Sequence, residues 1–93
     1  MMNQVQQLAK LLEYRNFAEK KMKQYLFSSW RFKFNTNKNR FGVCKYSRKT
    51  IEISAVLSLC TEDWATQDTI LHEIAHAIDC ERRGRSGHDW IWK

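Results

Sequence analysis

Residues 63–83 read DWATQDTILHEIAHAIDCERR. Its apolar side chains recur at steps of three and four, which predicts an amphipathic helix. Thr61 or Asp63 is expected to cap the helix, since a short polar side chain can accept the first free backbone N–H groups. Two arginines in the last turn and Gly84 after them are typical of a helix end. The predicted helix therefore ends at about Arg83.

The pattern His72-Glu73-Ile74-Ala75-His76 lies inside this predicted helix. At about 100° per residue, His72 and His76 are one turn apart and only about 40° apart around the axis. Both imidazoles can then reach one ion at the roughly 2.0–2.1 Å of zinc–nitrogen bonds. Glu73 is rotated about 100° from His72, so its carboxylate is expected beside the ion without being a ligand. The spacing predicts a catalytic zinc site.

The helix pattern also suggests which side chains pack into the core. The apolar face is expected to hold Ile70, Leu71, Ile74, Ala75 and Ile78. His72, Glu73 and His76 are expected to project away from that face, so core packing does not explain them. The alternative is a solvated or hydrogen-bonded histidine pair on an ordinary helix. We disfavour it because this spacing rarely falls on a helix by accident.

Two histidines leave the zinc site incomplete, because catalytic zinc usually has three protein ligands and a water. The third histidine of the chain, His88, follows His76 by twelve residues and is the leading candidate. Cys80 is a rival one turn beyond His76, although a small semi-buried core residue is its more common role. Asp79 and Asp89 are weaker candidates that would instead orient an imidazole through its N–H.

The rest of the chain predicts an α+β domain. A long helix is expected over residues 3–27, with strands over residues 29–34, 41–46 and 50–54. The apolar stripe of that helix is expected to include Val5, Leu8, Leu12, Ala18, Met22 and Leu26. Gly42 in the second strand marks either a bulge or a close backbone approach. The short connections predict that the three strands are antiparallel neighbours.

Composition limits the class of protein. The 93 residues allow one domain, 1–93, and an apolar content of 43% with four tryptophans argues against disorder. We find no secretion signal and no membrane-length apolar run, so no membrane partner is expected. Three scattered cysteines form a poor disulfide framework, which favours a reducing compartment. We therefore expect an intracellular monomer, cytoplasmic or associated with DNA in a nucleoid or nucleus.

The chain is basic, with sixteen Lys and Arg against ten Asp and Glu and a net charge of +6. A positive charge of this size favours encounter with polyanions, DNA first. The residues expected to form a basic sheet face for DNA are Arg31, Lys33, Lys45, Arg48 and Lys49. A solvated outer face is the simpler interpretation of the same residues.

Residues 40–93 resemble the SprT-like family of zinc metallopeptidases. The resemblance rests on FGVCKYS at 41–47, IEIS at 51–54, HEIAH at 72–76, and Gly87-His88 followed by an aromatic at Trp92. It implies zinc ligands His72, His76 and His88, with Glu73 as general base. It also implies a zincin-like minidomain of helices on an antiparallel sheet, and some members cleave proteins crosslinked to DNA.

This sequence differs from the family pattern in two ways. Asp89 stands where the family often has glycine, and the sequence stops at Lys93, where many members continue with more helix and a zinc ribbon. Cys44, Cys60 and Cys80 are too scattered to be the paired C-x-x-C knuckles of a ribbon. We therefore expect a minimal form without the ribbon.

The predicted function is hydrolysis of peptide bonds by a zinc-dependent endopeptidase, with protein or peptide substrates that include DNA-associated proteins. Strand 50–54 is expected to pair with an extended substrate as an edge strand. One alternative is a nucleic-acid-binding module whose zinc is structural and fully ligated by protein, Cys80 included. The other is an inactive scaffold or inhibitor, against which the intact Glu73 argues.

Overall fold

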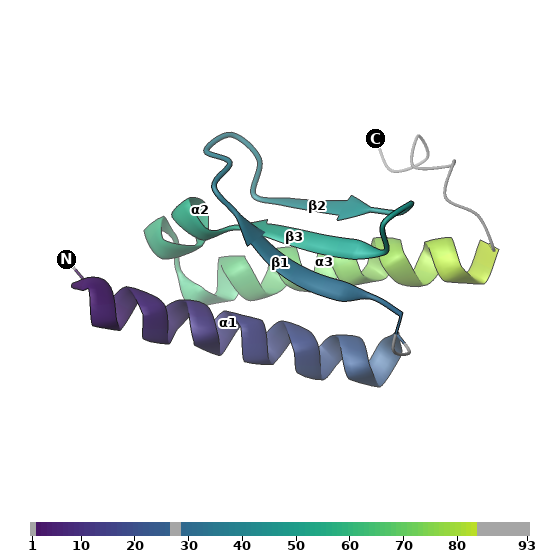
Figure 1. Cartoon of the computed structure of the whole chain (residues 1–93), viewed down its shortest axis with the longest axis horizontal. Helices are drawn as coiled ribbons and strands as arrows, with labels where there is room; N and C mark the ends of the chain where they lie inside the picture. Colours follow the sequence, from purple (N-terminus) through teal and green to yellow (C-terminus); the bar gives the residue numbers. More distant parts are fainter. Residues whose placement is uncertain (1, 27–28, 84–93) are drawn as a thin grey trace.

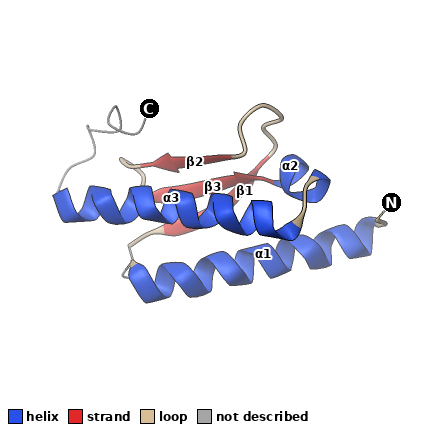
Figure 2. Ribbon diagram, turned by 180° about the vertical axis from the view of Figure 1, so that it is seen from behind, coloured by secondary structure: helices blue, strands red, loops and turns tan. Residues whose placement is uncertain are grey.

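The computed structural model describes residues 2–26 and 29–83. The elements, in chain order, are α1 (Gln4–Tyr25), β1 (Arg31–Asn35), β2 (Gly42–Lys45), β3 (Thr50–Ser54), α2 (Ala55–Cys60) and α3 (Asp63–Arg83). The two long helices run side by side in the same direction (Figure 1). Seen from behind, α3 lies across one face of the sheet (Figure 2). The α+β class and the long N-terminal helix are confirmed.

The sheet of the described residues is mixed, and the prediction of three antiparallel neighbours was wrong. Its strand order is β1-β3-β2. β1 pairs with β3 in parallel, from Arg31 opposite Thr50 to Asn35 opposite Ser54. β2 pairs with β3 antiparallel, from Gly42 opposite Ile53 to Lys45 opposite Thr50. β1 and β2 are therefore not paired with each other, because β3 lies between them.

Ser54 hydrogen-bonds to the loop between β1 and β2, which crosses the end of β3. Its backbone N–H donates to the carbonyl of Phe41 at 2.8 Å, and its hydroxyl donates to the carbonyl of Asn37. The same hydroxyl accepts the N–H of Leu57 at 3.0 Å and caps α2. One serine thus ends β3, starts α2 and fixes the loop that crosses the end of the sheet.

β3 is the central strand, which corrects its predicted role as a substrate-pairing edge. All five of its residues are buried, with Ile51 and Ile53 fully inaccessible. Both backbone edges of β3 are already hydrogen-bonded to neighbours, so it has no row of free N–H and C=O groups to offer. In the described part of the chain the sheet edges are β1 and β2.

α1 begins at the predicted place but buries a different face. Asn3 caps it and forms a reciprocal capping box with Gln6. The buried face is Tyr14, Ala18 and Met22, as predicted for the last two. Val5, Leu8 and Leu12 are instead 74%, 67% and 57% exposed. Leu12 lies about 120° around the axis from Ala18, so one helix cannot turn both stripes toward the same core.

The described residues contain no helix long and apolar enough to cross a membrane. The hydrophobic core lies between the two long helices and the sheet. Its buried members are Tyr14, Ala18, Met22, Leu26, Trp30, Phe32, Ile51, Ile53, Ile70, Ile74 and Ala77. α2 was not predicted, although Ser54 before three apolar residues is the N-cap signal that would have found it.

Candidate functional site

Helix α3 carries the His72–His76 pattern, and it is tied to the rest of the domain at both ends. Near its start the Tyr14 hydroxyl donates to Asp63 Oδ1 at 2.6 Å. Near its end the Trp30 indole N–H donates to Glu81 Oε2 at 2.7 Å. These contacts join the helix to α1 and to the start of β1, so the segment between them has a fixed position over the sheet.

The face that α3 turns to the core differs from the predicted one. Leu71 and Ala75 are exposed, whereas Glu73 and His76 are 8% and 7% exposed. The fully buried positions of the helix follow at three- and four-residue steps and are Thr66, Ile70, Ile74 and Ala77. The contact with β2 widens the covered face beyond this stripe to include Glu73. The site therefore borders the core instead of facing away from it.

His72 and His76 converge as the one-turn spacing predicts. Their Nε2 atoms are 2.9 Å apart and their rings are nearly perpendicular, at 86°. His72 is exposed, while burial, together with the nearby His72, lowers the pKa of His76 below its usual value. A neutral imidazole has a free ring lone pair, which is the form that binds metal ions.

Glu73 lies under β2, and its carboxylate is largely shielded from water. Burial raises the pKa of Glu73, and the nearby His72 and Arg40 oppose that rise. A carboxylate whose pKa moves up toward neutrality is a better general base at physiological pH than an ordinary one. Arg40, in the loop before β2, was not singled out from the sequence, and nothing in its local pattern indicated this position.

β2 is the edge strand that covers the site. A side-chain carbon added at Gly42 would lie 3.1 Å from both Cγ and Oε2 of Glu73, so the glycine marks a close backbone approach, one of its two predicted meanings. Two residues on, burial, with Glu73 and Cys80 nearby, raises the pKa of the Cys44 thiol to about 12. Cys44 is therefore a neutral packing residue beside the site.

Among the described residues, no third His, Cys, Asp or Glu joins the histidine pair to form a three-ligand group. Cys80 and Asp79 thus do not complete the site within that part of the chain, and Asp79 Oδ2 instead accepts Arg83 Nε at 2.8 Å. His88, the predicted third ligand, and Asp89 lie outside the described residues.

Comparison with protein families gives one finding that covers nearly all of the chain. The model of the SprT-like family matches residues 5–93. The chain belongs to the SprT-like family. The match extends the resemblance, which the motifs alone place at residues 40–93, over α1 as well. The family is associated with zinc metallopeptidases. Comparisons with curated proteins and with solved structures gave no match.

The donor atoms on α3 fit the zinc ion that the SprT-like family implies. A tetrahedral ion with bonds of 2.0–2.1 Å spaces its ligand atoms by roughly 3.3–3.4 Å. The two Nε2 atoms, at 2.9 Å, need to separate by only a few tenths of an ångström. Two imidazoles on adjacent turns, one exposed and one buried, are a suitable pair of nitrogen donors for this metal.

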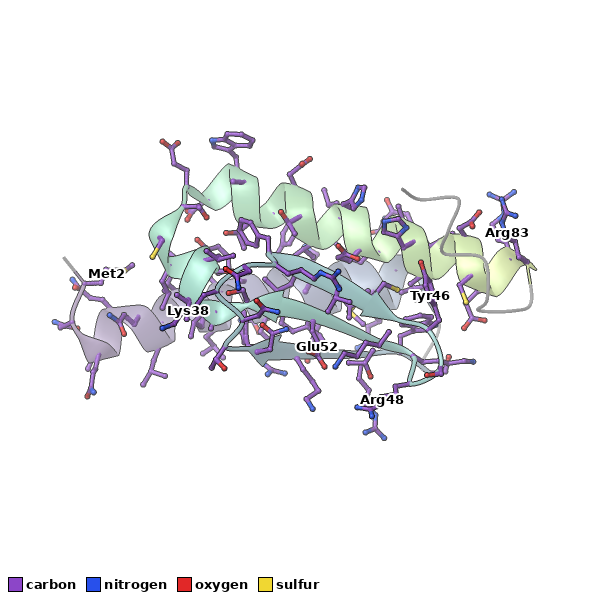
Figure 3. The ribbon with its side chains drawn as sticks, turned by 90° about the horizontal axis from the view of Figure 1, so that it is seen from above. Met2, Lys38, Tyr46, Arg48, Glu52 and Arg83 are labelled. Atoms are coloured by element: carbon purple, nitrogen blue, oxygen red, sulfur yellow. The ribbon has the colours of Figure 1, made fainter. Side chains whose placement is uncertain are left out.

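The predicted basic face is only partly available to a polyanion. Lys45 Nζ pairs with Glu52 Oε2 at 3.0 Å, and Lys49 Nζ pairs with Glu81 Oε2 at 3.2 Å. Arg48 projects from the side of the sheet that α3 leaves uncovered (Figure 3). Arg31 and Lys33 line a hollow of about 710 Å³ between α1 and β1, away from the histidine pair.

Proposed function

We propose that this SprT-like domain is a zinc-dependent endopeptidase with a zincin-like arrangement of its site. One observation carries the proposal: the two histidine Nε2 atoms lie 2.9 Å apart, and the buried Glu73 follows His72 directly under an edge strand. A merely structural histidine pair has no need of a carboxylate kept out of water at this point.

Three histidines of the chain would hold the metal: His72 and His76 from α3, and His88 from the C-terminal segment. A zinc ion held there supplies a Lewis acid that makes a water more acidic and polarises a carbonyl oxygen. Glu73 acts as general base: it accepts the proton of the attacking water and delivers it to the nitrogen of the departing amine. The shielding by β2 keeps its carboxylate poorly hydrated, which maintains its basicity.

An extended substrate would bind along β2. This strand has one partner in the described sheet, and it lies over Glu73. Its other backbone edge, which no described strand covers, can pair with a substrate segment through main-chain hydrogen bonds that do not depend on substrate sequence. We infer that the substrate is an unfolded or loop segment of a protein, because strands inside a folded sheet already have their backbone groups paired and native sheet edges are usually short, charged or covered.

Zinc content and a Glu73→Gln variant test the proposal together. The purified chain is expected to hold one zinc per molecule and to hydrolyse an unfolded protein such as casein. The variant keeps the zinc but is expected to lose activity by 10²–10⁴-fold, the usual contribution of a general base. Glu62→Gln, at an exposed glutamate just before α3, is the control that should retain activity. Full activity of the Glu73 variant, or a chain without stoichiometric zinc, would refute the mechanism.

The alternative of a nucleic-acid-binding module with structural zinc has less support. Two of its five expected cations are already engaged with Glu52 and Glu81, and a structural site does not require Glu73. Running the protease assay with and without single-stranded DNA separates the possibilities. Stimulation by DNA would show that binding directs the peptidase, whereas DNA binding without hydrolysis would favour the module.

A further inference from the structure

The contact between Gly42 and α3 leaves no space for a side chain. A Cβ atom at this position would lie 2.9 Å from Thr69 Cγ2 and 3.1 Å from both Cγ and Oε2 of Glu73. Distances under 3.0 Å are essentially never seen for a real Cβ, so something would have to move. The backbone of Gly42 is not left-handed, so the glycine is required here for space and not for conformation.

The geometry around Gly42 determines which group would move. Thr69 and Glu73 are one turn apart on α3, and the backbone of β2 lies over the gap between them. β2 cannot easily retreat, because Gly42 is paired with Ile53 in the antiparallel ladder. Thr69 is also restrained, since its hydroxyl donates to the carbonyl of Ala65 at 2.9 Å. The 2.9 Å contact requires a shift of Thr69 or of the backbone, whereas the two 3.1 Å contacts are relieved by the Glu73 side chain, which has three rotatable bonds.

We propose that Gly42 is a positioning residue for Glu73: the missing side chain fixes where the carboxylate lies beneath the edge strand. This inference rests on the proposed function for its catalytic meaning. A methyl group at residue 42 would displace the carboxylate from the water that it must deprotonate.

The Gly42→Ala variant tests this, with Val5→Ile as the kinetic control. Both substitutions add one methyl group, but Val5 lies on α1, is 74% exposed and is not part of the proposed substrate-binding strand. Gly42→Ala is expected to lower kcat at least tenfold, while KM and the zinc dissociation constant change by less than about threefold. Val5→Ile is expected to leave all three constants within about threefold of wild type. An equal loss of kcat in both variants would overturn the proposal.

The double variant Gly42→Ala/Thr69→Ser separates positioning from packing. Serine keeps the hydroxyl of Thr69 but removes the methyl at 2.9 Å, so the tightest contact disappears while the contacts with Glu73 remain. Gly42→Ala alone is expected to lower the melting temperature, and the double variant is expected to restore it while kcat stays low. Recovery of both the melting temperature and kcat would show that Gly42 is needed for packing alone. If Gly42→Ala does not fold, the double variant carries the kinetic test on the same criteria.

A direct measurement of Glu73 keeps this proposal separate from the proposed function. In the zinc-free chain, NMR should show nuclear Overhauser contacts between the α-protons of Gly42 and the γ-protons of Glu73. In Gly42→Ala, changed Glu73 side-chain shifts and an altered contact pattern are expected. Val43→Ile adds its methyl group on the opposite face of β2 and should leave the Glu73 signals unchanged. An unmoved Glu73 overturns the positioning role even if the enzyme is active. If the wild-type chain hydrolyses no protein, the peptidase proposal is refuted. The NMR measurement then still decides whether Gly42 positions the Glu73 side chain.

Discussion

At the scale of the residue, Glu52 is a buried carboxylate with a defined set of partners. It lies at the centre of β3, accepts the Asn35 amide at 3.0 Å and pairs with Lys45 at 3.0 Å. The Asn35 hydrogen bond, more than the neighbouring lysine charge, holds the pKa of Glu52 below its usual value. A lowered pKa in the folded state means that the carboxylate stabilises the fold above the unfolded pKa of about 4.3.

We predict that this stabilisation disappears as the pH falls from about 4.3 through the lowered folded pKa. Glu52→Gln should destabilise the chain at pH 7 by on the order of 1 kcal/mol, the usual difference between a hydrogen bond to a charged group and one to a neutral group. At pH 3 the difference between variant and wild type should shrink, because Glu52 is then protonated in the unfolded chain and the lowered pKa of the folded state no longer gives its full stabilisation. Thermal unfolding of wild type and variant at the two pH values measures the difference in their free energies of unfolding. A difference that does not change with pH would contradict the assignment.

The site residues themselves could be predicted from spacing, but their surroundings could not. The distance between His72 and His76 depends on helix geometry alone, so the pattern was sufficient to predict their convergence. The burial of Glu73 depends on β2, the strand Gly42–Lys45, which lies far earlier in the chain. Helical periodicity describes only the polarity of one element, so it placed Leu71 on the apolar face and Glu73 opposite. Gly42 was the sequence signal for this contact, since a glycine in a strand indicates that another group approaches the backbone closely.

At the scale of the element, the order of the strands escaped prediction for a definable reason. Short connections favour hairpins, and this holds for β2 and β3, which the turn at residues 46–49 joins. The six residues between β1 and β2 are also few enough for a hairpin, but Ser54 holds this loop open across the end of β3. A long-range contact therefore overrode a local preference, and the sequence pattern contains no trace of it.

The central position of β3 leads to a prediction about stability. Ile53 is fully buried between the helices and the two neighbouring strands, so Ile53→Ala should cost about 2–5 kcal/mol. Val43 is half-buried on the edge strand, and Val43→Ala should cost about 1 kcal/mol or less. Urea unfolding of the zinc-free chain measures both. Similar losses in the two variants would be inconsistent with β3 lying between β1 and β2.

At the scale of the whole molecule, a domain this small is expected to owe part of its free energy of unfolding to the bound metal. A chain of 93 residues buries a modest fraction of its surface, and only α3 among the described elements contributes histidines. The proposed site would join α3 to the segment that contains His88. Because an unfolded chain lacks the convergent histidines, zinc should bind the folded state far more tightly and stabilise it by mass action.

We therefore predict a large thermal shift on zinc binding. Free zinc at about a thousand times its dissociation constant should add about 4 kcal/mol, which corresponds to roughly 15–30 °C for a domain of this size. His72→Ala, His76→Ala and His88→Ala should each remove most of the shift, because each deletes a proposed ligand. Cys60→Ser is the control, since this exposed thiol would be the first to bind zinc adventitiously. A shift that survives the histidine substitutions and disappears in Cys60→Ser would place the zinc elsewhere and remove the basis of the peptidase proposal.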